Sequence, residues 1–154
     1  MNPVVILTMN NLEMNKQCVA SVQAQDIPTK LFIYDNGSTD GTAEWVKSLG
    51  VTCCLATENK GVSRGWNQML SFIFSNGYDH ALVINSDAFL PPWMYRRLLE
   101  YDAPFVTGIA VDHEVMEEPP FDIHDLNEHP DFSCFLIRRD AWEAVGPFDE
   151  SMKI

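Results

Sequence analysis

The sequence has few basic residues, because 10 lysines and arginines stand against 22 aspartates and glutamates, for a formal net charge of −12. This excess of negative charge disfavours binding to nucleic acid or to an anionic membrane surface. No apolar run approaches the ~20 residues that a membrane-spanning helix needs. The chain also opens on Met1, Asn2 and Pro3, without the basic residues that begin a signal peptide. We therefore expect a cytoplasmic protein with no membrane span and no nucleic-acid partner.

Cysteine is scarce as well, with four residues at positions 18, 53, 54 and 134. Their spacing matches neither a zinc site nor a disulfide framework. We expect reduced, buried thiols, as is usual in the cytosol. Cys53 and Cys54 are adjacent in a strand-like run, so their side chains should point to opposite faces of a sheet.

What the sequence does contain is a regular alternation of apolar strands and amphipathic helices. Strands are predicted at 4–8, 31–34, 51–56, 81–84, 105–110 and 132–138, and helices at 11–25, 42–49, 61–75, 91–101 and 140–146. Asn11 and Asp140 are the expected caps of the first and last helix. The alternation predicts an α/β domain with a mostly parallel sheet that helices cover on both faces. At 154 residues, 46% of them hydrophobic, the chain suffices for one domain.

An acidic, glycine-containing turn follows the second predicted strand. Asp35 stands at the carboxyl end of this strand, and Asn36, Ser38 and Asp40 follow it among glycines that permit unusual backbone angles. Ligands of open α/β sheets bind at such strand ends. A calcium loop counted from Asn36 would require a glutamate at its twelfth position, where Lys47 stands, so calcium is excluded. An ordinary polar turn, with Asp40 as a helix N-cap, stays open as an alternative.

A second polar motif, Asn85, Ser86 and Asp87, follows the strand at 81–84. Two oxygen-bearing side chains two residues apart can share one hard cation. Mg²⁺ and Mn²⁺ favour carboxylate and carbonyl oxygens, and Mg²⁺ is often held by one or two carboxylates together with substrate phosphates. Two acidic strand ends in one sheet favour a nucleotide site more strongly than either does alone.

These motifs, taken in their order along the chain, resemble those of the family 2 glycosyltransferases of the GT-A fold. The resemblance rests on the segments at 4–11, 35–42, 59–67, 85–87 and 137–150. It implies a Rossmann-like three-layer α/β/α sandwich. It also implies an inverting transfer of a sugar from a nucleotide diphosphate donor, with a UDP-sugar favoured, to an unknown sugar, lipid or protein acceptor.

The resemblance also assigns roles to residues. Asp87 would bind Mn²⁺ or Mg²⁺, Asp35 would contact the edge of the base, and the backbone near Thr8 would form the other wall of the base pocket. Arg64 would face the base or the phosphates, although an exposed helix arginine is an equally simple interpretation. The expected nucleotide-binding residues are Thr8, Asn10, Asp35, Asn36, Ser38, Asn59, Gly61, Arg64, Asn85 and Ser86. Lys60 is a further cation close to this set.

The sequence departs from the family pattern in two places. Asn85 stands where the family has the first aspartate of its metal motif. The family also carries its catalytic base about ten residues after a Phe-Asp-Glu segment that corresponds here to residues 148–150, whereas the sequence ends at Ile154. We therefore expect the base and the C-terminal part of the acceptor site to be missing, with Asp149 and Glu150 as weak substitutes. The alternative is a module that binds a nucleotide or nucleotide sugar without transfer.

A third interpretation, a sugar nucleotidyltransferase, is set aside because the turn at 8–11 has neither the glycine nor the arginine of those enzymes. Residues 112–131 are acidic, contain three prolines and show no periodicity. We expect a flexible loop near the acceptor side, from which Asp112 or His113 could face the metal. An incomplete domain would also expose apolar surface, so a homo-oligomer is a further expectation.

Overall fold

The computed structural model describes residues 1–111, 117–118 and 132–151. The strands are β1 (Asn2–Thr8), β2 (Thr29–Asp35), β3 (Thr52–Leu55), β4 (His80–Asn85), β5 (Phe105–Thr107) and β6 (Cys134–Arg138). The helices are α1 (Leu12–Gln23), α2 (Thr42–Ser48), α3 (Val62–Ser75), α4 (Met94–Glu100) and α5 (Arg139–Val145). The predicted alternation of strands and helices is confirmed.

The described strands form one sheet in the order β3-β2-β1-β4-β6-β5. β1 pairs in parallel with β2 and β4, and β2 pairs in parallel with β3. β6 runs antiparallel to both of its neighbours. The sheet is thus mostly parallel, as expected, and β6 reverses direction. The strand order places β1 in the middle, so that the carboxyl ends of β1, β2 and β4 lie next to one another.

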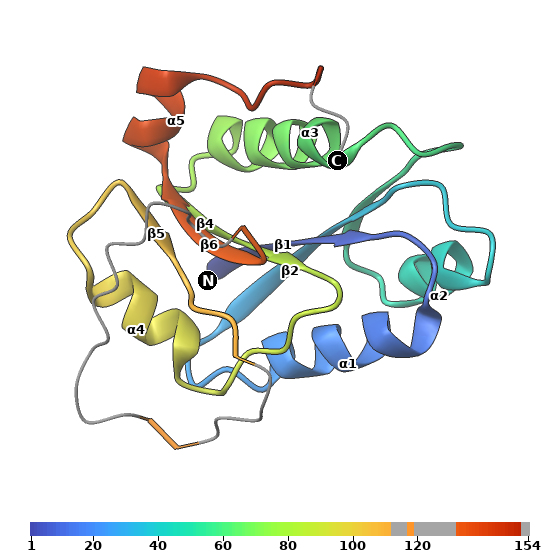
Figure 1. Ribbon diagram of the computed structural model, residues 1–154, viewed down its shortest axis with the longest axis horizontal. Helices are drawn as coiled ribbons and strands as arrows, with labels where there is room; N and C mark the ends of the chain where they lie inside the picture. Colours follow the sequence, from blue (N-terminus) through green and yellow to red (C-terminus); the bar gives the residue numbers. More distant parts are fainter. Residues whose placement is uncertain (112–116, 119–131, 152–154) are drawn as a thin grey trace.

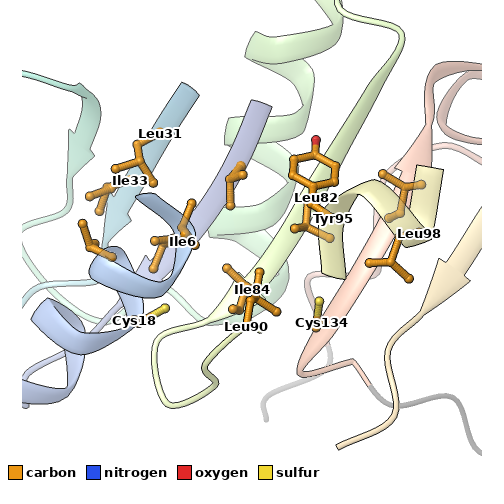
Figure 2. Packing of buried hydrophobic residues seen from close by; sticks show 14 of the residues in the cluster. Ile6, Cys18, Leu31, Ile33, Leu82, Ile84, Leu90, Tyr95, Leu98 and Cys134 are labelled. Carbon is orange, nitrogen blue, oxygen red and sulfur yellow. The ribbon is translucent and has the colours of Figure 1, made fainter. Parts of the chain in front are cut away.

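Helices cover both faces of the sheet, and α3 and α5 lie on the face opposite α1, α2 and α4 (Figure 1). β1 and β4 are almost entirely buried, which explains their continuous apolar sequences. On the face of α1 and α4, Ile6, Ile33 and Ile84 pack with Cys18 and Tyr95 (Figure 2). The Tyr95 hydroxyl donates a hydrogen bond to the Pro3 carbonyl at 2.7 Å, so that this buried polar group is satisfied.

The helix at 61–75 is predicted from apolar residues at helical spacing, and the structure largely confirms its apolar face. Of these residues, Trp66, Met69, Leu70, Ile73 and Phe74 are buried in α3, and Val62, at the start of the helix, is partly buried. A Cβ atom at Gly65 would lie 2.4 Å from a Leu7 methyl group and 2.8 Å from the Tyr34 ring. The missing side chain therefore lets α3 approach the ends of β1 and β2 closely.

The helix boundaries require three corrections. Asn11 precedes α1, but its side chain makes no capping hydrogen bond, because its backbone is left-handed with φ at 60°. Asp140 was expected to cap the last helix and instead lies within its first turn, one residue after the start at Arg139. Helix α4 begins at Met94 rather than at the proline pair 91–92.

The four cysteines are free thiols. Cys18 and Cys134 are buried, whereas Cys53 and Cys54 are only partly buried, so the expectation of four buried thiols was too strong. Cys53 packs on the α1 face and Cys54 on the α3 face, which confirms the predicted alternation. Within the described ranges, no helix is long and apolar enough to cross a membrane.

Candidate functional site

An open cavity of about 550 Å³ lies at the carboxyl edge of the sheet. The strand register explains its position, because Leu7 pairs with Asn85 and Thr8 pairs with Asp35. β1, β2 and β4 therefore end at the same level. Among the described residues, the cavity is lined by Leu7, Thr8, Met9, Asn10, Asn11, Met14, Asn36, Asn59, Val62, Asn85, Ser86 and Asp87.

Seven of the expected site residues line this one cavity, namely Thr8, Asn10, Asn36, Asn59, Asn85, Ser86 and Asp87. They come from four separate segments of the sequence. Four of them are asparagines, which offer both donors and acceptors without charge. Asp87 is the one acid among the described lining residues. The cavity therefore has a neutral wall of amides on the β1 and β2 side and a carboxylate beyond β4.

The turns after β1 and β2 are joined by side-chain hydrogen bonds. The backbone N–H of Asn10 donates to Ser38 Oγ at 2.7 Å, and the backbone N–H of Thr39 donates to the side-chain Oδ1 of Asn10 at 2.8 Å. Asn10 and Asn11 both have positive φ, at 56° and 60°. A left-handed backbone costs an L-residue about 1–2 kcal/mol, although asparagine tolerates it better than most residues. The neighbouring turn therefore holds this wall in a conformation that the local chain alone would rarely keep.

Asp35 lies behind the wall rather than on it. Its side chain is fully buried, and its carboxylate accepts hydrogen bonds from the Thr8 hydroxyl at 2.8 Å, the Ser38 N–H at 2.9 Å and the Ser38 hydroxyl. Three donors on one buried carboxylate fix the start of the turn relative to β1. A contact between Asp35 and a nucleobase would require this network to rearrange.

A second network joins the β2 turn to the segment before α3. Asn36 donates from Nδ2 to Asn59 Oδ1 at 2.9 Å and accepts from the Lys60 N–H at 2.7 Å. Asn59 Oδ1 also accepts from the Gly61 N–H. Gly61 thus supports the wall through its backbone. The Lys60 ammonium forms an ion pair with Glu58.

The turn after β4 is far less constrained. The Asn85 N–H donates to the Ser133 carbonyl at 2.9 Å, and the Ala88 N–H donates to the Asn85 carbonyl at 3.1 Å. The Asp87 side chain is exposed and makes no hydrogen bond within the described part of the chain. Burial and, to a smaller extent, the Asp87 charge raise the pKa of the Cys18 thiol to about 12. Cys18 is therefore a protonated core residue.

Arg64 and Glu150 lie elsewhere, at a second open cavity of about 460 Å³ beside α3 and α5. The Glu150 carboxylate accepts from Asn67 Nδ2 at 3.0 Å. Asp149 accepts from the Ser151 N–H at 2.8 Å. Hydrogen bonding by Ser151 holds the pKa of Asp149 below its usual value, which makes it a poor proton acceptor.

Asp112, His113 and most of the acidic segment at 112–131 lie outside the described residues.

The described residues contain no group of three or more His, Cys, Asp or Glu side chains that could hold a metal ion. A magnesium or manganese ion that also binds phosphates needs fewer protein ligands, because Mg²⁺ keeps several waters and takes one or two carboxylates. Asp87 and the Asn85 amide, both without a hydrogen-bond partner for their side chains in the described ranges, fit such a donor set.

Sequence comparison identifies the family. The model for "Glycosyl transferase family 2" matches residues 4–125. The chain belongs to this family. A search of curated proteins found no match.

Solved structures of glycosyltransferases share the fold of this family 2 chain. Mannosyltransferase PcManGT from Pyrobaculum calidifontis, in complex with GDP-Man and Mn²⁺, superposes with a TM-score of 0.67 at 17% identity, over 97% of this chain and 48% of that one. S. aureus TarS (residues 1–349) gives 0.70 at 17% identity, over 100% and 52%. The UDP complex of the same protein gives 0.69 at 18% identity, over 99% and 52%. The expected GT-A fold is confirmed, and the chain spans about half the length of these proteins.

Sequence reasoning missed several residues of the site. Met9, Asn11 and Met14 line the cavity, and Asn15 is a fully buried residue of α1. The Asn15 amide donates to the Asn10 carbonyl at 2.8 Å. One sequence feature could have indicated the turn, because two consecutive asparagines before a helix favour a left-handed backbone. Nothing local indicated that Asn15, on the helix, would support the turn.

Proposed function

We propose that this family 2 domain binds a nucleotide diphosphate sugar, with a UDP-sugar favoured, and transfers the sugar with inversion to a sugar, lipid or protein acceptor. One observation carries the proposal. The ends of three neighbouring strands and the segment before α3 place seven of the expected residues on one cavity, with Asp87 exposed at one side.

Each part of the cavity then has a function. The neutral amides of Asn10, Asn36 and Asn59 suit the nucleoside, whose base and ribose need uncharged donors and acceptors. Thr8 fixes the floor through its hydrogen bond to Asp35. Asn85, Ser86 and Asp87 suit the diphosphate end. Asp35 and Ser38 hold the wall in place, and Gly61 does so through its backbone N–H.

The charge of the protein argues for a cation at the diphosphate end. The net charge is −12, and neither Arg64 nor Lys60 is among the described residues that line the cavity. Arg64 lies at the second cavity, and Lys60 pairs with Glu58. Asp87, assisted by the Asn85 amide, would hold Mn²⁺ or Mg²⁺. A divalent ion supplies there the positive charge that stabilises a diphosphate leaving group.

The donor preference rests on the family resemblance and on related structures. TarS has been solved with UDP, as has glucosyl-3-phosphoglycerate synthase from Mycobacterium tuberculosis, at a TM-score of 0.52 and 20% identity. PcManGT has been solved with GDP-Man and Mn²⁺. These ligands support a nucleotide diphosphate in the same cavity here. The four free thiols favour a reducing compartment such as the cytoplasm.

A specific observation favours binding without transfer as the second candidate. An inverting enzyme needs a general base within hydrogen-bond reach of the acceptor hydroxyl. Glu150 lies at the second cavity with its carboxylate bonded to Asn67, and the Asp149 carboxylate bonds to the Ser151 N–H. Within the described ranges, neither lines the cavity that holds Asp87. The base would then come from a partner subunit or from residues not described in the structure.

Calorimetric titration with UDP, GDP and dTDP, each with and without Mn²⁺, tests the proposed site. UDP should bind in the presence of Mn²⁺, and Asp87→Asn should weaken this binding about 100-fold, or about 2.8 kcal/mol. The matched control is Asp102→Asn, the same change at an exposed aspartate that precedes β5 at the opposite edge of the sheet. Absence of binding for all three nucleotides, or equal effects of the two substitutions, would contradict the assignment.

A second experiment separates transfer from binding alone. The protein is incubated with UDP-sugars and Mn²⁺ over a panel of sugar, lipid and peptide acceptors, and the anomeric configuration of any product is read by NMR. An inverted glycoside confirms the transferase. Tight donor binding with no product across the panel favours the binding module.

A further inference from the structure

Helices α1 and α2 both begin beside the candidate nucleotide site, and neither is capped by a side chain at its own N-cap position. The N-cap of α1 is Asn11, whose side chain makes no capping bond, and that of α2 is Gly41, which has no side chain. Unpaired N–H groups at a helix start need an acceptor. Figure 1 shows that the start of α1 lies next to α2, so one group can reach both helices.

That group is the Asp40 carboxylate. Its Oδ2 accepts a hydrogen bond at 3.0 Å from the backbone N–H of Leu12, the first residue of α1. Its Oδ1 accepts from the Thr42 N–H at 3.1 Å and from the Thr42 hydroxyl at 2.7 Å, at the start of α2. One side chain thus caps two helices that are separated in the sequence by strand β2.

The Asp40 contacts continue to the wall of the cavity. Thr42 Oγ1 accepts from Asn15 Nδ2 at 3.2 Å, and the same amide group donates to the Asn10 carbonyl at 2.8 Å. Leu12 directly follows Asn10 and Asn11, the two residues with left-handed backbone that line the cavity. Asp40 itself is not among the described lining residues.

We propose that Asp40 is a positioning residue of the nucleotide site, whose carboxylate holds the left-handed Asn10–Asn11 turn against the β2 turn so that the cavity wall is formed before the ligand arrives. This inference rests on the proposed function for its ligand, but the geometry of the wall can be tested without any ligand. A carboxylate is needed because each of its oxygens serves a different helix. Asparagine has one acceptor oxygen, so it can cap one helix and must turn an NH₂ group toward the N–H of the other.

The test compares Asp40→Asn with Asp140→Asn in UDP titrations with Mn²⁺. Asp140 is the matched control, because it is an exposed first-turn aspartate whose carboxylate accepts from one backbone N–H, that of Ala141, on a helix away from the cavity. Asp40→Asn should weaken UDP binding about tenfold, in line with the loss of one cap, and Asp140→Asn should leave it unchanged. The titrations are run at a temperature well below the thermal unfolding midpoint of each variant, so that a loss of stability is not mistaken for a loss of affinity.

A rescue variant separates positioning from a general structural effect. Asn11→Gly removes the steric strain of the left-handed backbone at this position, because glycine adopts positive φ as readily as negative φ. If Asp40 acts by holding this turn, Asn11→Gly should recover part of the affinity lost in Asp40→Asn. Its effect in the otherwise unchanged protein serves as the reference.

Amide hydrogen exchange of the protein without nucleotide gives the second readout. The amides of Asn10 and Thr39 bond to Ser38 and Asn10, not to Asp40. Faster exchange at these two amides in Asp40→Asn shows that the wall has loosened beyond the lost contacts. If wild type binds UDP and the variant binds it equally well, the proposal is overturned. If wild type binds no nucleotide, the proposed function fails, and unchanged exchange at Asn10 and Thr39 overturns the positioning role separately.

Discussion

The two sides of the cavity are built in different ways. On the β1 and β2 side, side-chain hydrogen bonds hold most of the polar groups of the two turns, including the carboxylates of Asp35 and Asp40. On the β4 side, Asp87 is exposed and its carboxylate bonds to none of the described residues. A wall that is ordered in advance lowers the entropic cost of binding, whereas a free carboxylate keeps its oxygens available for a cation. The β1 and β2 side is thus held in place by contacts within the protein, whereas the carboxylate on the β4 side stays available to a ligand.

The largest effect should come from filling space on the organised side. A Cβ atom at Gly37, where φ is 83°, would lie 2.7 Å from the backbone of Glu58. Gly37→Ala should therefore cost about 3 kcal/mol of unfolding free energy, from the left-handed backbone and the overlap together. Gly77→Ala is the control, since φ is 90° and nothing lies within 4 Å, and its cost should be about 1 kcal/mol. Equal costs in urea denaturation would show that the β2 turn is not packed tightly against the segment before α3.

An identical substitution on each side sharpens the contrast. Asp35→Asn places an NH₂ group among three donors in a fully buried position, which should cost about 2–3 kcal/mol of unfolding free energy. Asp87→Asn, at an exposed side chain, should change that free energy by less than about 0.5 kcal/mol. Chemical denaturation of both variants provides the measurement. A stability loss for Asp87→Asn as large as that for Asp35→Asn would remove the distinction between the two sides.

The smallest expected effect is one of pH. Hydrogen bonds from the Thr42 hydroxyl and from backbone N–H groups hold the pKa of Asp40 below its ordinary value of 3.8. A depressed pKa in the folded state means that the carboxylate stabilises the fold above the unfolded-state pKa. This contribution is lost as the pH falls through the folded-state pKa, that is, below about pH 4. The thermal unfolding midpoint (Tm) of the wild-type protein should therefore fall more steeply with falling pH than that of Asp40→Asn between about pH 5 and pH 3. Parallel curves for the two proteins would contradict the capping role.

The fold was largely predictable because its determinants are local. Continuous apolar runs such as that of β4, and helical spacing such as that of α3, place the strands and helices within a few residues. Positions with a specific capping geometry were not predictable. Asn11 and Asp140 are both frequent cap residues, yet neither caps its helix as expected. At the start of α1, the Leu12 N–H donates to the carboxylate of Asp40, in the turn after β2, and not to the Asn11 side chain. Asp140 lies inside the first turn of α5.

The site divides in the same way. The strand-end motifs identified Asn36, Asn85 and Asp87, because residues that follow buried parallel strands meet at one edge of the sheet. Arg64 was assigned to the nucleotide from the family resemblance, but the direction of its side chain depends on the rotation of α3, and it lines the second cavity. Asp35 was assigned to the base, whereas the structure buries it among Thr8 and Ser38.

By itself, then, the sequence determined the alternation of strands and helices, the acidic strand ends and the membership of glycosyl transferase family 2. These features depend on contacts between near neighbours and on short motifs. Only the tertiary structure decided which turns meet, because the order β3-β2-β1-β4-β6-β5 brings together residues that are far apart in the chain. The pairing of Asp40 with Leu12, 28 residues away, is such a decision. It follows from the packing of β1 beside β2 and from the need of each helix start for an acceptor.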